Sequence, residues 1–145
     1  MDEDKYLNNL YQRLLEQRKI KIDASKIWLQ EIRKTAGVYL IRINGEVKYV
    51  GETGNIYKRM NDLLKTYNHT FRRSLGKYLY SDSMDYNKAN SKRKFSERIE
   101  RKLDDYMREN CEVSFLEVKL GRKELEELVQ ERYGDKLLNM RSKRK

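Results

Sequence analysis

Two tyrosines and one arginine recur at an even interval and could together act on a phosphate ester. Tyr39 ends a Gly-Val-Tyr triplet, Tyr49 begins a Tyr-Val-Gly triplet ten residues later, and Arg59 follows after ten more. Hydrolysis of a phosphodiester needs a base that activates water and a cation that stabilises charge on the phosphoryl oxygens. A phenol, with a pKa of about 10, is a weak base unless nearby cations favour the phenolate. Arg59 and a divalent ion could supply that positive charge.

The metal chemistry open to this chain is narrow. Cys111 is its one cysteine and His69 its one histidine. An internal disulfide and a structural zinc site of four Cys or His ligands are therefore both excluded. Any metal ion must be held by oxygen ligands.

The two tyrosines lie on a predicted β-hairpin. Residues 37–51 alternate β-branched or aromatic residues with others around an Asn-Gly dipeptide, which is a strong hairpin signal. A two-residue turn would place the tyrosines on opposite faces of the sheet. A three-residue loop with Gly45 in the left-handed conformation instead pairs Tyr39 with Tyr49 and Arg42 with a glutamate. Matched charges and apolar pairs favour this second register, so we expect both phenols on one face, directly opposed.

The surrounding patterns predict an α+β fold. We expect a small, mainly antiparallel three-stranded sheet of residues 37–43, 46–50 and 112–120, flanked by helices. Apolar residues at helical spacing near the start predict a helical arm. The expected organisation is an arm over residues 1–35, a single domain over 36–140 and a basic tail over 141–145.

The charge balance predicts a polyanionic partner. The chain carries 33 Lys and Arg against 23 Asp and Glu, a formal charge of +10, with a pI near 9.6; nucleic acid is the usual partner of such a protein. No apolar run approaches the ~18 residues of a membrane span, and the acidic start is the reverse of a signal peptide. We expect a cytoplasmic protein with no membrane partner.

The hairpin, the helix after it and the acidic last helix resemble the GIY-YIG nuclease family. The stretch from Tyr49 to Arg59, Tyr-Val-Gly-Glu-Thr-Gly-Asn-Ile-Tyr-Lys-Arg, carries most of this resemblance, which covers residues 36–139. The resemblance implies an endonuclease that cleaves DNA with Mg²⁺ or Mn²⁺. It implies that Tyr39 is the general base acting on a metal-coordinated water and that Arg59 grips the scissile phosphate. Tyr49 would orient or stabilise that phosphate, and a late glutamate would hold the metal.

The identity of that glutamate depends on the family pattern. Residues 124–131 contain four glutamates. The family places apolar residues before the metal ligand and on the following helical turns, which favours Glu126. It also places an asparagine about twelve residues after the ligand, and Glu127 keeps that spacing to Asn139. We expect Glu126 to bind the metal, with Glu127 as the alternative.

One departure from the family concerns the residue four positions after the arginine. Many members carry His or Tyr there to assist the base, whereas this chain has Leu63. His69 is a candidate catalytic replacement, and the alternative is an exposed residue near a helix N-terminus.

Four residues are candidates for binding nucleic acid: Lys58, Arg72, Arg73 and Asn139. Arg72 and Arg73 resemble a motif of some bacterial members, although a solvated role is equally open. Lys58 belongs to a set of lysines that could equally form a solvated surface.

Two functions are consistent with these patterns. The first is a metal-dependent DNA endonuclease of phage or restriction type, acting in a bacterial or phage-infected cell. One site of this size cuts one strand, so cleavage of both strands would need successive nicks, a homodimer or a higher oligomer. The alternative is a catalytically inactive nucleic-acid-binding module of the same fold. A basic RNA-associated scaffold is a more remote possibility.

Overall fold

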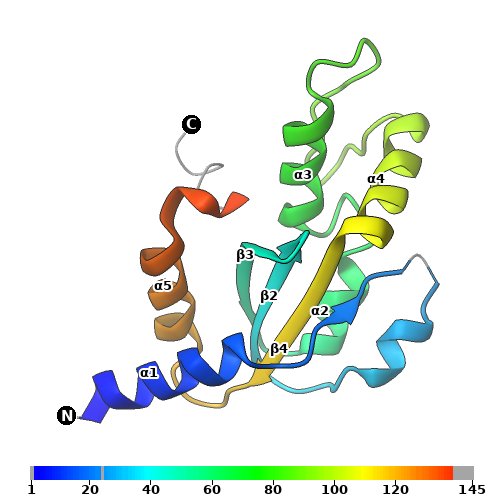
Figure 1. Ribbon diagram of the computed structural model, residues 1–145. Coiled ribbons are helices and arrows are strands. Elements are labelled where there is room, and N and C mark those ends of the chain that lie inside the picture. Colours follow the sequence, from blue (N-terminus) through cyan, green and yellow to red (C-terminus); the bar gives the residue numbers. More distant parts are fainter. Residues whose placement is uncertain (1, 24, 139–145) are drawn as a thin grey trace.

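A four-stranded antiparallel sheet forms the centre of the structure, a computed structural model that describes residues 2–23 and 25–138 (Figure 1). The strand order is β1-β4-β2-β3. The strands are β1 (Ile20–Lys21), β2 (Gly37–Ile43), β3 (Glu46–Thr53) and β4 (Cys111–Glu117). The expected α+β class is confirmed. The sheet has four strands rather than three, because β1 pairs with β4.

Helices cover both faces of this sheet (Figure 1). One face is covered by α1 (Asp2–Leu15) and α5 (Arg122–Tyr133). The other is covered by the 3₁₀ helix η1 (Ile27–Glu31), α2 (Ile56–Asp62), α3 (Thr70–Tyr80) and α4 (Glu97–Asn110). A short 3₁₀ turn, η2 (Gly134–Lys136), follows α5. No described helix is both long and apolar enough to cross a lipid bilayer.

The β2–β3 hairpin combines a two-residue turn with a bulge. Asn44 and Gly45 both have positive φ, 50° and 86°, which suits the tight turn that Asn-Gly sequences favour. The pairing register then shifts between Ile41 and Arg42. Lys48 is the extra residue on β3, since Tyr49 pairs with Ile41 and the next pair on β3 is Val47 with Arg42.

This bulge corrects the expected register. The prediction that Tyr39 lies directly opposite Tyr49 is wrong, because Tyr39 pairs with Gly51. The prediction that both phenols stand on one face is right, because one extra residue reverses the alternation that a two-residue turn would impose. Tyr39 and Tyr49 are therefore diagonal neighbours on the face covered by α2 and α3.

The N-terminal segment joins the same sheet and core. Leu10 and Leu14 of α1 are buried in the cluster that also contains Leu125 of α5. Arg42 of β2 donates to the carbonyl oxygen of Leu15 at 3.2 Å and to Ser114 Oγ at 2.9 Å. Because Leu15 ends α1, this guanidinium stabilises the negative end of the helix dipole. Residues 1–35 thus contribute both a helix and the edge strand β1.

A buried ion-pair network joins α3 to α4. The side chain of Arg72 is 2% exposed and donates to the carboxylates of Glu100 and Asp104, each at 2.8 Å. It also donates to Thr66 Oγ1 at 2.9 Å and to the Glu100 carbonyl at 3.0 Å. The expectation that Arg72 binds nucleic acid is therefore wrong: its guanidinium is enclosed and its donors are occupied within the fold.

Replacement of Arg72 by leucine should destabilise the fold by about 3 kcal/mol, because the carboxylates of Glu100 and Asp104 would lose their buried partner. Urea unfolding followed by circular dichroism measures this loss. Arg98→Leu is the matched control, since it removes the exposed ion pair between Arg98 and Asp85 and should change the unfolding midpoint far less. Equal shifts for the two variants would contradict the structural role of Arg72.

Candidate active site

Two tyrosines, a histidine and a phenylalanine form an aromatic cluster on the inner face of the hairpin. The rings of Tyr39 and Tyr49 stack with centroids 6.2 Å apart and planes inclined by 24°. The His69 ring lies 5.9 Å from Tyr39 and 5.7 Å from Tyr49. Phe71 packs edge-on against Tyr49 at 5.3 Å. Strands β2 and β3 and the start of α3 therefore meet at the two phenols.

Gly51 sets the position of the Tyr39 ring. It lies directly across from Tyr39 in the β2–β3 pairing. A Cβ atom at Gly51 would overlap the phenol ring of Tyr39 and its hydroxyl. Tyr39 can fold over β3 only because position 51 has no side chain. Its hydroxyl is thereby aimed at His69.

His69 is buried and bonded through both ring nitrogens. It is the N-cap of α3, and its Nδ1 accepts from the backbone N–H of Phe71 at 3.1 Å. Its Nε2 lies 3.0 Å from the Tyr39 hydroxyl oxygen. Because Nδ1 accepts, the neutral imidazole carries its proton on Nε2 and donates it to Tyr39. The alternative of an exposed histidine is wrong, since the side chain has no solvent-accessible surface.

This histidine reaches the tyrosine by a route that the family spacing did not predict. Leu63, at the position where many family members carry His or Tyr, is fully buried in the apolar core. His69 contacts Tyr39 from the start of α3, beyond the end of α2. Its place before a helix was visible in the sequence. Its contact with Tyr39 depends on a tertiary approach that has no local signature.

Arg59 supplies positive charge beside the phenols. The α2 helix that carries it begins where Asn55 accepts from the Lys58 backbone N–H at 3.0 Å. The Arg59 guanidinium donates to the Asn68 carbonyl at 2.8 Å and lies 3.9 Å from the Asp62 carboxylate. Its side chain is 29% exposed. The Arg59 guanidinium is therefore held by the Asn68 carbonyl and remains partly exposed to solvent, as a phosphate ligand must be.

Burial opposes ionisation of the aromatic cluster. Burial raises the pKa of Tyr39, and the neighbouring Tyr49 raises it further, whereas the Arg59 guanidinium lowers it. Burial likewise raises the pKa of Tyr49, with Arg59 again opposing the effect. Burial first, and then Arg59 and Arg73, holds the pKa of His69 well below its usual value. The resting site therefore contains neutral phenols and a neutral imidazole.

Of the two candidate metal ligands, Glu126 is the one placed near the tyrosines. The Glu126 carboxylate raises the pKa of both Tyr39 and Tyr49 through its negative charge. Glu126 is half-buried, whereas Glu127 is exposed. No group of three or more His, Cys, Asp or Glu side chains in residues 2–23 and 25–138 could hold a metal ion. Glu126 is thus the candidate carboxylate whose charge acts on both phenols.

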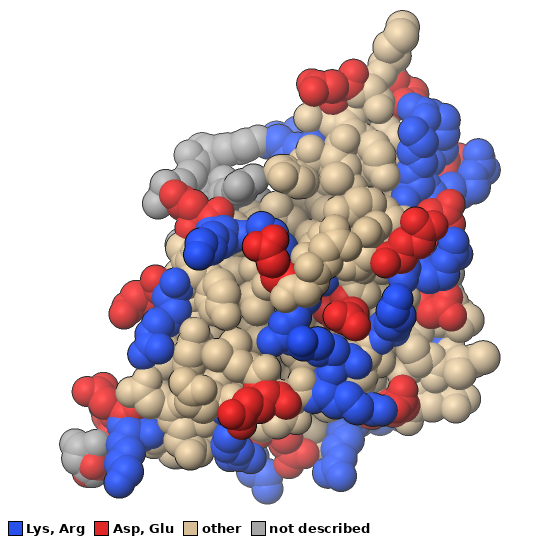
Figure 2. Space-filling view, in the orientation of Figure 1, with Lys and Arg blue, Asp and Glu red and all other residues tan. Residues whose placement is uncertain are grey.

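The other candidate nucleic-acid-binding residues differ in their exposure and hydrogen bonding. Lys58 is exposed on α2. Arg73 of α3 donates to the carbonyls of Thr66 and Tyr67 at 2.9 and 2.8 Å. Asn139 lies outside the described residues. Figure 2 shows Lys and Arg interspersed with Asp and Glu on the face that it displays, rather than gathered into one basic surface.

The His69 imidazole should stay neutral from about pH 8 to well below its usual pKa of about 6.5, because burial and two guanidinium groups oppose its protonation. His69 is the one histidine of the chain, so its ¹H–¹⁵N side-chain resonances can be followed without ambiguity. The free energy of unfolding should also fall as the pH drops below about 6.5, since only the unfolded chain takes up this proton. A titration midpoint near 6.5 would contradict the buried, doubly bonded imidazole.

The family of the chain follows from comparison with known proteins. The GIY-YIG catalytic domain family matches residues 11–145. No curated protein and no solved structure matches the chain. The matched region takes in the last five residues of α1, all four strands and every later helix. The chain belongs to the GIY-YIG catalytic domain family.

Proposed function

We propose that this protein is an endonuclease that hydrolyses phosphodiester bonds in DNA with a bound Mg²⁺ or Mn²⁺ ion. The observation that carries the proposal is the stacking of Tyr39 on Tyr49 with His69 bonded to Tyr39, and the charges of Arg59 and Glu126 both act on this pair. These groups supply a base, a cation for the phosphate and a carboxylate for a metal. Membership of the GIY-YIG family supports this assignment of chemistry.

Tyr39 is the proposed general base. His69 donates to its oxygen at 3.0 Å, and a hydrogen bond to the oxygen stabilises the phenolate more than the neutral phenol. Arg59 favours the phenolate further through its charge. His69 is thus a positioning residue that orients the phenol and assists its ionisation. Tyr49, stacked on Tyr39, would orient or stabilise the phosphate.

The donor set suits a hard divalent cation. Mg²⁺ is commonly bound through one or two carboxylates, with water and substrate phosphate oxygens completing its octahedron. Glu126 would be its protein ligand, with Glu127 as the alternative. Such an ion, when bound, makes a coordinated water more acidic and stabilises charge on the phosphoryl oxygens. Arg59 would bind the same phosphate from the side of α2.

DNA is the proposed substrate because the chain is strongly basic and because exposed cations adjoin the site. Lys58 lies one residue before Arg59 on the exposed side of α2. Each phosphate that such side chains neutralise releases counterions and strengthens binding at low salt. One site would cut one strand, so cleavage of both strands would need successive nicks or two copies of the chain. The alternative of an inactive module is based in part on Leu63, which cannot assist Tyr39. The hydrogen bond between His69 and Tyr39 argues against that reason.

Nicking of supercoiled plasmid should require Mg²⁺ or Mn²⁺ and should stop in EDTA. Glu126→Gln should reduce nicking by at least about a hundredfold, because it preserves size but removes the charge that holds the ion. Binding of DNA in EDTA, followed by fluorescence anisotropy, should be retained or tightened, since a negative charge has left the site.

Glu127→Gln is the matched control and should nick at nearly the wild-type rate. If Glu127→Gln abolishes nicking while Glu126→Gln does not, the spacing to Asn139 identifies the ligand instead. If both variants nick normally, the metal is held elsewhere. If the wild type binds DNA without ever cutting it, the protein is an inactive binding module.

A further inference from the structure

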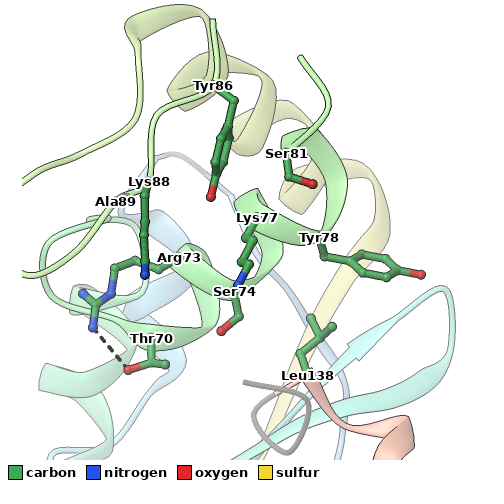
Figure 3. A pocket seen from close by; sticks show the side chains of 10 residues that line it. All are labelled: Thr70, Arg73, Ser74, Lys77, Tyr78, Ser81, Tyr86, Lys88, Ala89 and Leu138. Carbon is green, nitrogen blue, oxygen red and sulfur yellow. Dashed lines mark hydrogen bonds between the residues drawn. The ribbon is translucent and has the colours of Figure 1, made fainter. Parts of the chain in front are cut away.

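Three cavities adjoin one another, since each shares lining residues with the next. The largest, about 420 Å³, lies between α3 and residues 81–89 (Figure 3). It shares Tyr78 and Leu138 with a cavity of about 230 Å³ at the tip of the β2–β3 hairpin. That cavity shares Lys48 and Lys136 with a third, of about 350 Å³, which extends to Lys19. We name these three adjoining cavities together the basic groove.

Positive charge predominates among the residues that line the basic groove. Cationic side chains line it from end to end: Lys19, Lys48, Lys77, Lys88, Lys136 and Arg73. Glu46 is the one carboxylate among the described residues that line it. A row of cations of this kind suits a chain of phosphates.

Aromatic rings lie between these cations. Tyr78 of α3 is 59% exposed and stands where the two cavities that share it meet. Tyr86 reaches into the largest cavity from the segment after α3 (Figure 3). Its ring is held by Phe95, with centroids 5.8 Å apart. Tyr78 is exposed and Tyr86 is partly buried. Unpaired bases stack on accessible aromatic rings that lie among cations.

The groove begins beside the candidate active site. Arg73 lines the largest cavity, and its charge also acts on Tyr49 and His69. Thr70, the residue after His69, lines the same cavity and accepts from Arg73 at 3.3 Å. A strand whose phosphate lies at Arg59 and Tyr39 could therefore continue past Arg73 into the groove.

We propose that the basic groove binds an unpaired DNA strand next to the scissile phosphate, so that the substrate has a single-stranded segment beside the cut. A duplex would present phosphates to the lysines, but its bases are stacked on each other and cannot stack on the tyrosines. Only an unpaired strand uses both the cations and the rings. This inference rests on the proposed nuclease function and specifies its substrate.

The test compares binding of fluorescein-labelled oligothymidylate of about 12 nucleotides with a blunt duplex of the same length, by anisotropy in EDTA. Tyr78→Ala should weaken binding of the single strand by about fivefold to a hundredfold, the range for loss of one base–aromatic stack, and leave duplex binding unchanged. Tyr78→Phe should retain wild-type binding. Lys77→Ala should lower the slope of log affinity against log salt by about 0.7 for the single strand.

Tyr6→Ala is the matched control, because Tyr6 is also exposed, at 43%, and lies on α1 outside the groove. It should leave single-strand binding unchanged. The inference is overturned if Tyr78→Ala binds the single strand normally, if Tyr6→Ala weakens it equally, or if duplex binding falls to the same extent. Tighter binding of oligouridylate than of oligothymidylate would overturn the choice of DNA.

Plasmid nicking by the same preparations separates this inference from the proposed function. Binding that depends on Tyr78 in a protein that never nicks would support the groove and refute the nuclease. Metal-dependent nicking with single-strand binding that is insensitive to Tyr78 would refute the groove and leave the nuclease standing.

Discussion

The extra residue Lys48 in strand β3 determines which face of the sheet carries the candidate chemistry. A hairpin with a two-residue turn and no bulge would place Tyr49 on the face covered by α1 and α5, away from Tyr39. With the bulge, Tyr49 pairs with Ile41 and stacks on Tyr39. The same shift places Gly51 opposite Tyr39, where the missing side chain leaves room for the phenol. The contact of that phenol with His69 depends on both features.

Burial and positive charge have opposite effects on the pKa of the two phenols in the site. Burial raises the pKa of both phenols, so an isolated cluster of this kind would have no basic group at neutral pH. Arg59 acts in the opposite direction, and the proposed Mg²⁺ ion would act likewise. Because water is largely excluded, these charges act on the phenols more strongly than they would in solution. The Glu126 carboxylate raises the pKa of both tyrosines and so disfavours the phenolate. A metal ion bound to Glu126 would offset this effect.

Local patterns predicted the elements that carry the site. The Asn-Gly turn and the alternation around it predicted the hairpin. Asn55, a residue type that commonly caps helices, begins α2. The family pattern of apolar residues around the metal ligand favoured Glu126, which is half-buried on α5. These features depend on residues close in the sequence, for which turn and capping chemistry is specific.

Features that depend on distant residues could not be predicted in this way. Strand β1 is two residues long within a polar run and is stabilised by pairing with β4. The Lys-Ile-Lys-Ile alternation around it is too short to predict a strand. Arg72 and Arg73 are adjacent and chemically identical, yet only Arg72 meets the carboxylates of α4. The bond between His69 and Tyr39 joins residues 30 positions apart. Each of these outcomes is decided by a partner brought near by the fold.

The pH dependence of the single-turnover nicking rate tests most directly whether Tyr39 is the base. Between about pH 6 and about pH 8.5 the logarithm of the wild-type rate should rise by about one per pH unit, because burial keeps the phenol pKa above this range and the phenolate fraction grows tenfold per unit. Tyr39→Phe should be at least about a hundredfold slower across the range. A rate that is flat with pH, or one that Tyr39→Phe reproduces, would contradict a tyrosine base in this protein.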